Sequence, residues 1–152
     1  MQLVIRAPDI EELPALSELC MRSKAVWGYD AAFIEACRRE LSFEASDLES
    51  SQVAVAARGD SLLGVAQVRM TAQGEVDLAK LFVEPAELRR GVGQALFAWA
   101  RDTARCLGAV RMIIEADPEA APFYRRLGAR DAGLVPSGSI AGRMLPKLVL
   151  EF

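Results

Sequence analysis

The most informative chemistry in this sequence lies between Val83 and Gly93, where the chain reads V-E-P-A-E-L-R-R-G-V-G. An apolar run ends before Pro85, a short basic loop follows, and a helical pattern begins directly after the loop. A glycine-bearing turn that leads into a helix directs several unpaired backbone N–H groups at one point, where the helix dipole also favours negative charge. Arg89 and Arg90 add two positive charges there. The segment therefore predicts a site for a pyrophosphate-bearing ligand.

The glycine pair, Gly91 and Gly93, also permits other interpretations. It can be a strand-to-helix connection that binds nothing. A dinucleotide fingerprint fails at its third glycine, where Leu96 stands, although Glu115 mimics the ribose-binding acid about 20 residues further on. A Walker A loop requires lysine after its last glycine, and Gln94 stands there. The pattern disfavours both nucleotide folds and leaves the ligand-free connection open.

Composition limits which reactions the chain can catalyse. The 152 residues fit one domain, residues 1–152, and 52% of them are apolar, as a sizeable core requires. There is no histidine, which excludes Ser-His and Cys-His nucleophile schemes and most catalytic zinc sites. We expect no metal, and a mechanism built from Tyr, Asp, Glu, Lys, backbone groups and water.

Charge and cysteine usage bear on partners and location. A net charge of −3 disfavours a nucleic-acid partner. No apolar run approaches the roughly 20 residues that cross a bilayer, and the first residues lack the features of a secretory signal. Cys20, Cys37 and Cys106 lie in helical patterns, as buried thiols of a reducing compartment do. We therefore expect a cytoplasmic protein with no membrane partner.

Hydrophobic periodicity predicts an α+β fold with a mixed, mostly antiparallel sheet of about six to seven strands and about four flanking helices. The Phe43–Ser51 segment is expected to be loop. The helix after Val83 makes a crossover that should place the next strand parallel to the third meander strand. Expected strands are Gln2–Arg6, Gln52–Ala57, Leu62–Met70, Glu75–Val83, Val110–Glu115, Ala129–Val135 and Met144–Phe152, and expected helices begin at Pro8, Ala31, Gly91 and Asp117.

The run V-E-P-A-E-L-R-R-G-V-G-Q-A-L, followed by a helix, a strand and F-Y-R-R-L-G-A, resembles the GNAT superfamily of acyl-CoA-dependent N-acetyltransferases. Element order extends the resemblance over nearly the whole chain. Gly91 and Gly93 fill the glycine sites of the family pattern Q/R-x-x-G-x-G/A, but Leu88 stands where Gln or Arg is usual. The resemblance implies that acetyl-CoA, or another acyl-CoA, is the co-substrate.

The resemblance also implies where the acyl-CoA binds. Backbone N–H groups of the glycine loop would hold the pyrophosphate, and the pantetheine arm would pair with the last meander strand. Asp117 either contacts the pantetheine or caps the following helix, and Phe123 packs against either the cofactor or the core. The implied cofactor-binding residues are Leu81, Phe82, Val83, Arg89, Arg90, Gly91, Val92, Gly93, Gln94, Ala95, Asp117 and Phe123.

Catalytic roles follow from the same resemblance. Tyr124 matches the tyrosine that protonates the leaving thiolate, and the backbone N–H of Leu81 would polarise the thioester carbonyl. The amine would attack directly, without an acyl-enzyme. Asp77 or Glu75, acting through water, would deprotonate the acceptor; the alternative is that both are solvent-facing strand carboxylates.

The acceptor is expected between the first two helices and the last two strands. Trp27 and Tyr29 form either an aromatic wall or a staple between helices, and Lys24 or Arg143 would grip a substrate carboxylate. Alternatively, Arg143 forms a salt bridge within a hairpin. Lys80 either enters the same cleft or lies on a solvated face of its strand. S-K-x-x-W-G-Y together with P-S-G-S-I-x-G-R-x-L-P resembles one uncharacterised subgroup of the superfamily.

The expected function is acetyl transfer to a small primary amine or amino-acid-like acceptor. Acylation of a protein N-terminus or lysine uses the same chemistry and stays open, as does a non-catalytic acyl-CoA binding or sensing domain. A nucleotide-binding structural domain is a third class. A homodimer is possible through the last strands, where apolar residues serve either a partner or the core: Leu145, Leu148, Leu150 and Phe152.

Overall fold

The computed structural model describes residues 1–152 and contains one seven-stranded sheet in the order β1-β2-β3-β4-β5-β7-β6. Every neighbouring pair is antiparallel except β4 and β5, which run parallel as the crossover predicts. The predicted α+β class and mostly antiparallel sheet are confirmed. The strands are β1 (Val4–Arg6), β2 (Gln52–Arg58), β3 (Ser61–Ala72), β4 (Glu75–Val83), β5 (Arg111–Glu115), β6 (Arg130–Pro136) and β7 (Met144–Glu151).

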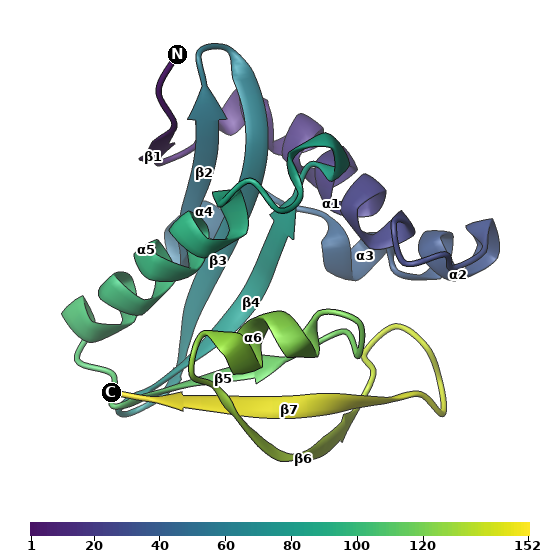
Figure 1. Ribbon diagram of the computed structural model, residues 1–152, viewed down its shortest axis with the longest axis vertical. Helices are drawn as coiled ribbons and strands as arrows, with labels where there is room; N and C mark the ends of the chain where they lie inside the picture. The colour runs from purple at the N-terminus through teal and green to yellow at the C-terminus, as the bar shows by residue number, and fades with distance from the viewer.

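Helices cover both faces of the sheet (Figure 1). One face packs against α1 and the short helices that follow it, and the other packs against α5 and α6. None of the helices has the length and apolar composition needed to cross a bilayer. The helices are α1 (Leu13–Ala25), α2 (Ala31–Ala36), α3 (Arg38–Leu41), α4 (Asp47–Ser50), α5 (Val92–Cys106) and α6 (Ala121–Arg126), with 3₁₀ turns at Ile10–Glu12 and Pro85–Glu87.

Apolar stripes of the expected periodicity form the two faces of the core. On α5, Leu96, Phe97, Ala100 and Ala104 recur at helical spacing and are almost fully buried against the sheet. Of the apolar residues near the C-terminus, Leu148 and Leu150 are buried in this core, so they do not form a free apolar surface.

The sheet opens into two halves between β4 and β5. These strands pair only over Glu75–Asp77 and Arg111–Ile113, so the rest of β4 has no partner on that side. Figure 1 shows β4 rising away from β5 and β7, with α6 lying on the lower half. The open edge of β4 therefore leaves backbone groups available for a ligand strand.

The helices differ from the sequence prediction at several points, and the first one begins at Leu13 after a 3₁₀ turn and not at Pro8. The Phe43–Ser51 segment, expected as loop, contains α4, which buries Leu48 in part against the α1 side of the core. The helix expected over 31–41 divides at Cys37, where the N–H bonds the carbonyl three residues back at 3.0 Å. A single-turn tightening of this kind is not visible in hydrophobic periodicity.

The last short helix begins at Ala121 and not at Asp117. Asp117 instead forms the turn before it: its carboxylate accepts from the N–H of Glu119 at 2.8 Å, and its carbonyl accepts from Ala120 and Ala121. An aspartate that bonds the backbone two residues on makes a turn rather than the first residue of a helix.

Candidate active site

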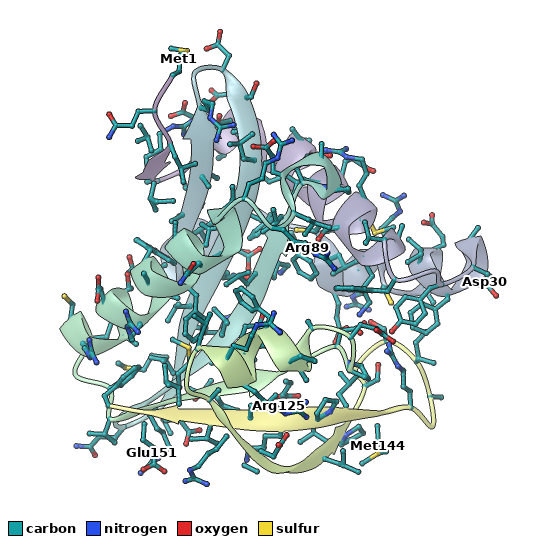
Figure 2. All side chains as sticks on the ribbon, in the orientation of Figure 1. Met1, Asp30, Arg89, Arg125, Met144 and Glu151 are labelled. Carbon is teal, nitrogen blue, oxygen red and sulfur yellow. The ribbon has the colours of Figure 1, made fainter.

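A cavity of about 1220 Å³ fills the opening between the two halves of the sheet. Its walls come from β4, the loop before α5, the end of β5, α6 and the end of α1. Figure 2 labels Arg89, which lies near the middle of the molecule on the loop that borders this cavity. The same cavity therefore borders the glycine loop, β4, α6 and the end of α1.

The N-terminus of α5 presents backbone N–H groups that no protein atom accepts. Gly91 is the N-cap, with φ 86°, and no side chain caps the helix. The first amide of α5 with a protein acceptor is that of Ala95, which bonds the Gly91 carbonyl at 3.0 Å. The amides from Arg89 to Gln94 form no hydrogen bond with the protein. Unpaired amides at a helix N-terminus are suited to an anion.

Gly93 packs closely against α6 at the same place. A Cβ there would lie 3.3 Å from the Phe123 ring, which is a tight contact, and 3.5 Å from the Val83 side chain, which is an ordinary one. The Phe123 ring would have to shift by a few tenths of an ångström to admit a side chain. The glycine thus keeps the loop and the aromatic residues of α6 together.

The two arginines of the loop differ in position. Arg89 lines the cavity and adopts φ 64°, the only positive φ outside glycine. Arg90 is exposed and lies 3.5 Å from Glu87, which also bonds Arg58 at 2.8 Å. The structure brings Arg89 to the cavity, whereas Arg90 turns toward a neighbouring carboxylate.

The open edge of β4 carries at least one backbone donor toward the cavity. The N–H of Val83 points at the hydroxyl of Ser23 on α1, 3.4 Å away, and both residues line the cavity. Successive N–H groups alternate between the two edges of a strand, so the N–H of Leu81 faces the same open side. Leu81 and Phe82 line the cavity as well.

Tyr124 lies on α6, where it belongs to the core and also lines the cavity. It is only 6% exposed, and its ring packs against Phe123 at 5.1 Å and Phe97 at 5.9 Å between ring centroids. Its hydroxyl forms no hydrogen bond with the protein. Burial raises the pKa of the phenol well above its ordinary value, so the group remains protonated at neutral pH.

A register shift in β4 sets which of its side chains enter the cavity. Gln67 pairs with Lys80 but Val68 pairs with Leu78, so Ala79 is an extra residue in the strand. Residues three apart normally point to opposite faces of a strand, and one extra residue reverses that rule. Asp77 and Lys80 consequently share the face toward α1, and both line the cavity.

Asp77 lines the cavity and is the last residue of β4 that pairs with β5. Burial raises the pKa of its carboxyl group to about 6, and the nearby charges of Glu115 and Glu75 act in the same direction against Arg69. A carboxyl group with this pKa is mostly ionised at neutral pH and can still hold a proton.

Asp117 is surrounded by three of the residues expected to bind the acceptor. Lys24 lies 2.7 Å from its carboxylate, Tyr29 donates its hydroxyl at 2.9 Å, and Arg143 lies at 3.5 Å. Arg143 also donates to the Tyr29 hydroxyl at 2.6 Å. Burial alone would raise the pKa of Asp117, but hydrogen bonds from Lys24, the Glu119 N–H and Tyr29, together with the Lys24 charge, lower it below its ordinary value. We name Asp117, Lys24, Tyr29 and Arg143 the Asp117 cluster.

The aromatic residues of the loop between α1 and α2 take different positions. Tyr29 stacks on Phe33 at 4.1 Å between ring centroids, and the Arg143 guanidinium lies 4.9 Å from the centre of the Phe33 ring. Trp27 is 40% exposed and lines the cavity. Tyr29 therefore belongs to the Asp117 cluster, while Trp27 alone faces the cavity as a wall.

Comparison with known families identifies this arrangement. The family model described as an acetyltransferase (GNAT) domain matches residues 15–135, which is most of the chain. The chain belongs to the GNAT acetyltransferase family. A search of curated proteins finds no match to this member.

Solved structures agree with that assignment at the level of fold. The PaiA N-acetyltransferase of Thermoplasma acidophilum, solved in complex with coenzyme A, has a TM-score of 0.81 and 18% identity over 100% of both chains. The protein yncA of Salmonella typhimurium, solved with acetyl-CoA, has a TM-score of 0.72 and 22% identity over 99% of this chain and 94% of its own. The ribosomal-protein-S18-alanine N-acetyltransferase of Escherichia coli has a TM-score of 0.72 and 18% identity over 99% of this chain and 94% of its own.

Sequence reasoning missed part of this GNAT site. Arg69 and Ser23 line the cavity, and Gln67 holds Lys80 from the neighbouring strand. Nothing in the sequence pattern marks the extra residue in β4 that turns Lys80 inward. A charged residue inside an apolar strand was the one available signal, and it pointed to Lys80. No group of Cys, Asp and Glu side chains is arranged to hold a metal ion.

Proposed function

We propose that the protein is an acyl-CoA-dependent N-acyltransferase that moves an acetyl group from acetyl-CoA to a small primary amine or amino-acid-like acceptor. One observation carries the proposal: the unpaired amides at the start of α5 and the side chain of Tyr124 belong to residues that line the same cavity. Membership of the GNAT family supports acetyl transfer, and the coenzyme A and acetyl-CoA in the PaiA and yncA structures support the choice of donor.

The residues present fit acyl-CoA. The unpaired amides from Arg89 to Gln94 are the donors that a diphosphate requires, and Arg89 adds a charge beside them. The open edge of β4 offers the Leu81 N–H to an extended pantetheine arm, as an added strand would use it. Acyl-CoA supplies the activated thioester at the end of that arm, near the α6 tyrosine.

The chain's own groups then divide the chemistry among them. Asp77 accepts, through water, the proton that the acceptor ammonium must lose before it can attack. The N–H of Leu81 donates to the thioester carbonyl oxygen as negative charge develops there. Tyr124 donates its proton to the departing sulfur. The new N–C bond replaces the C–S bond, and both substrates are present together, so no acyl-enzyme forms.

Two measurements on the wild-type protein test this proposal. Thermal unfolding is followed with acetyl-CoA, ATP and NAD at equal concentration; a ligand at 100 times its dissociation constant adds about 2.7 kcal/mol of stability. We expect a large shift with acetyl-CoA alone. Thiol release from acetyl-CoA is then measured against a library of amines, amino acids and peptides.

The outcomes separate the competing functions. Binding with thiol release that depends on an amine supports the enzyme. Acetyl-CoA binding with no thiol release for any acceptor would favour a sensing domain. Release with peptides only would favour protein acetylation, and stabilisation by ATP or NAD in place of acetyl-CoA would overturn the proposal.

A further inference from the structure

We propose that Lys80 receives a carboxylate of the acceptor, so that the acceptor is a zwitterionic amino acid and not a simple amine. This inference rests on the function proposed above and names the class of acceptor. It follows from the position of Lys80 in the cavity, from its partners, and from the carboxylates that already pair with Lys24, Arg143 and Arg69.

Lys80 is a buried cation with a single hydrogen-bond partner. It is 9% exposed, and its ammonium donates to the Gln67 side-chain oxygen at 3.1 Å. The Phe43 ring centre lies 4.6 Å away. An ammonium has three donors, so two of them have no protein acceptor. Lys80 takes part in none of the ion pairs of the molecule, and a buried charge without an ionic partner is unfavourable.

Gln67 fixes the position of this ammonium. Its side chain is fully buried, and its NH₂ group donates to the Ser51 hydroxyl at 2.9 Å, which turns its oxygen toward Lys80. The lysine is thus held by a neutral group, it lines the cavity, and its remaining donors have no protein acceptor. Because Gln67 is neutral and two N–H donors of Lys80 have no protein acceptor, the Lys80 charge is available to an incoming anion.

Three other cations near Lys80 and Asp117 already have carboxylate partners. Lys24 and Arg143 both approach Asp117, at 2.7 Å and 3.5 Å. Arg69 lies 3.3 Å from Asp47. The substrate carboxylate that the sequence assigns to Lys24 or Arg143 therefore finds a better receptor in Lys80.

Asp77, whose carboxylate would lie near the amine of an amino-acid acceptor, is three residues before Lys80 on the same strand. The extra residue at Ala79 puts Asp77 and Lys80 on one face of β4. At about 3.3 Å of rise per residue, the two backbone positions are at most roughly 10 Å apart. An amino acid with one hydrogen bond of about 2.8 Å at each end, directly or through one water, spans such a distance. Its amine then lies toward Asp77 and its carboxylate toward Lys80.

Burial disfavours the charged form of Lys80, and a ligand carboxylate would offset that effect. Burial lowers the pKa of the Lys80 ammonium, with the Arg69 charge acting in the same direction against Cys20, Asp47 and Glu40. A carboxylate placed on the two open donors would favour the charged form again. Neutral ligands would not provide that compensation.

Matched pairs of acceptors test the inference. Wild-type protein is assayed by thiol release from acetyl-CoA with each protein amino acid and with the amine that lacks only its carboxylate. We expect kcat/KM for the best amino acid to exceed that of its amine at least tenfold. In Lys80→Met, which keeps the length of the side chain without its charge, that ratio should fall to about one.

A matched variant controls for the loss of one positive charge. Arg39→Met removes an exposed cation on α3 that forms no ion pair, and the ratio should stay at the wild-type value. Propionate should raise KM for the amino acid in wild-type protein without changing KM for acetyl-CoA. This second measurement decides the matter if Lys80→Met does not fold.

Several results would overturn the inference. Equal kcat/KM for amino acid and amine in the wild type would do so. So would an equal fall for both acceptors in Lys80→Met, because a lysine that acts as base serves them alike. Acetyl-CoA binding with no amino acid among the acceptors overturns this inference alone, whereas absence of acetyl-CoA binding overturns the proposed function as well.

Discussion

The Tyr124 hydroxyl is the residue-scale feature with the clearest chemical consequence. Burial keeps it protonated at neutral pH, it forms no hydrogen bond with the protein, and Tyr124 lines the cavity. Replacing it in Tyr124→Phe should lower kcat about 10²-fold or more, as expected for loss of a general acid. The dissociation constant for acetyl-CoA should be unchanged, because only the hydroxyl is removed.

The control for that variant lies in the same chain. Tyr29→Phe also removes a phenolic hydroxyl, but one that donates to Asp117. We expect kcat to stay near the wild-type value, because Tyr29 does not line the cavity. An unchanged kcat in Tyr124→Phe with a true acceptor would remove the tyrosine from the mechanism.

Asp77 predicts a pH dependence of the reaction. Its pKa of about 6 means that the carboxylate, the form that accepts a proton, is lost as pH falls through 6. The value of kcat/KM for the acceptor should therefore rise with pH up to about that value, beyond any ionisation of the acceptor itself. Asp77→Asn should have low activity and lack this limb in a pH profile; a limb that persists would assign the ionisation to another group.

The same carboxyl group predicts a pH dependence of stability. Its pKa is raised on folding from the ordinary 3.8 to about 6, so the ionised form is disfavoured in the native protein. The cost accumulates as pH rises between these two values and is complete above 6. Asp77→Asn removes that cost. Its melting temperature relative to wild type should be higher at pH 8 than at pH 4, measured by thermal unfolding in both buffers. An equal difference at both pH values would contradict the raised pKa.

At the scale of elements, the turn into α5 depends on one backbone conformation. Gly91 has φ 86°, and a Cβ at this position would meet nothing within 4 Å. The whole cost of Gly91→Ala should thus be backbone strain of about 1–2 kcal/mol, because a left-handed conformation is unfavourable for alanine. Gly91→Asn should cost less. Denaturant unfolding measures both, and equal stability of Gly91→Ala and wild type would contradict the strained turn.

The Asp117 cluster joins the end of α1 to three loops that are far apart in the sequence, so its removal should lower the free energy of unfolding. Asp117→Ala leaves Lys24 and Arg143 half-buried without their shared carboxylate. Breaking a buried ion pair by deleting one partner typically costs about 3 kcal/mol. Asp131→Ala is the matched control, because its partner Arg125 is exposed and little change is expected. Equal effects in the two variants would show that the cluster is not structural.

Some elements and site residues could be predicted from local pattern, and others could not. The α5 stripe, the glycine turn and the parallel crossover follow from periodicity and turn chemistry, which neighbouring residues determine. The inward position of Lys80 depends on the register of β4 against β3, and the Asp117 cluster on contacts between residues up to 114 positions apart. Contacts between residues so far apart cannot be predicted from a local sequence pattern.

At the scale of the whole molecule, the division of the sheet gives the protein its site. Since β4 and β5 pair over three residues only, the two halves diverge and enclose a cavity of about 1220 Å³. The amides of α5 lie on one half and Tyr124 on the other, while the loop between β6 and β7 reaches α3 and the Asp117 cluster. A ligand that bridges both halves should stabilise the entire fold.

The most direct test is a crystal structure of the protein with acetyl-CoA. We predict that the diphosphate lies on the backbone amides between Arg89 and Gln94, and that the sulfur lies within hydrogen-bonding reach of the Tyr124 hydroxyl, about 3–4 Å. A diphosphate held elsewhere, or a sulfur remote from Tyr124, would contradict the proposed function.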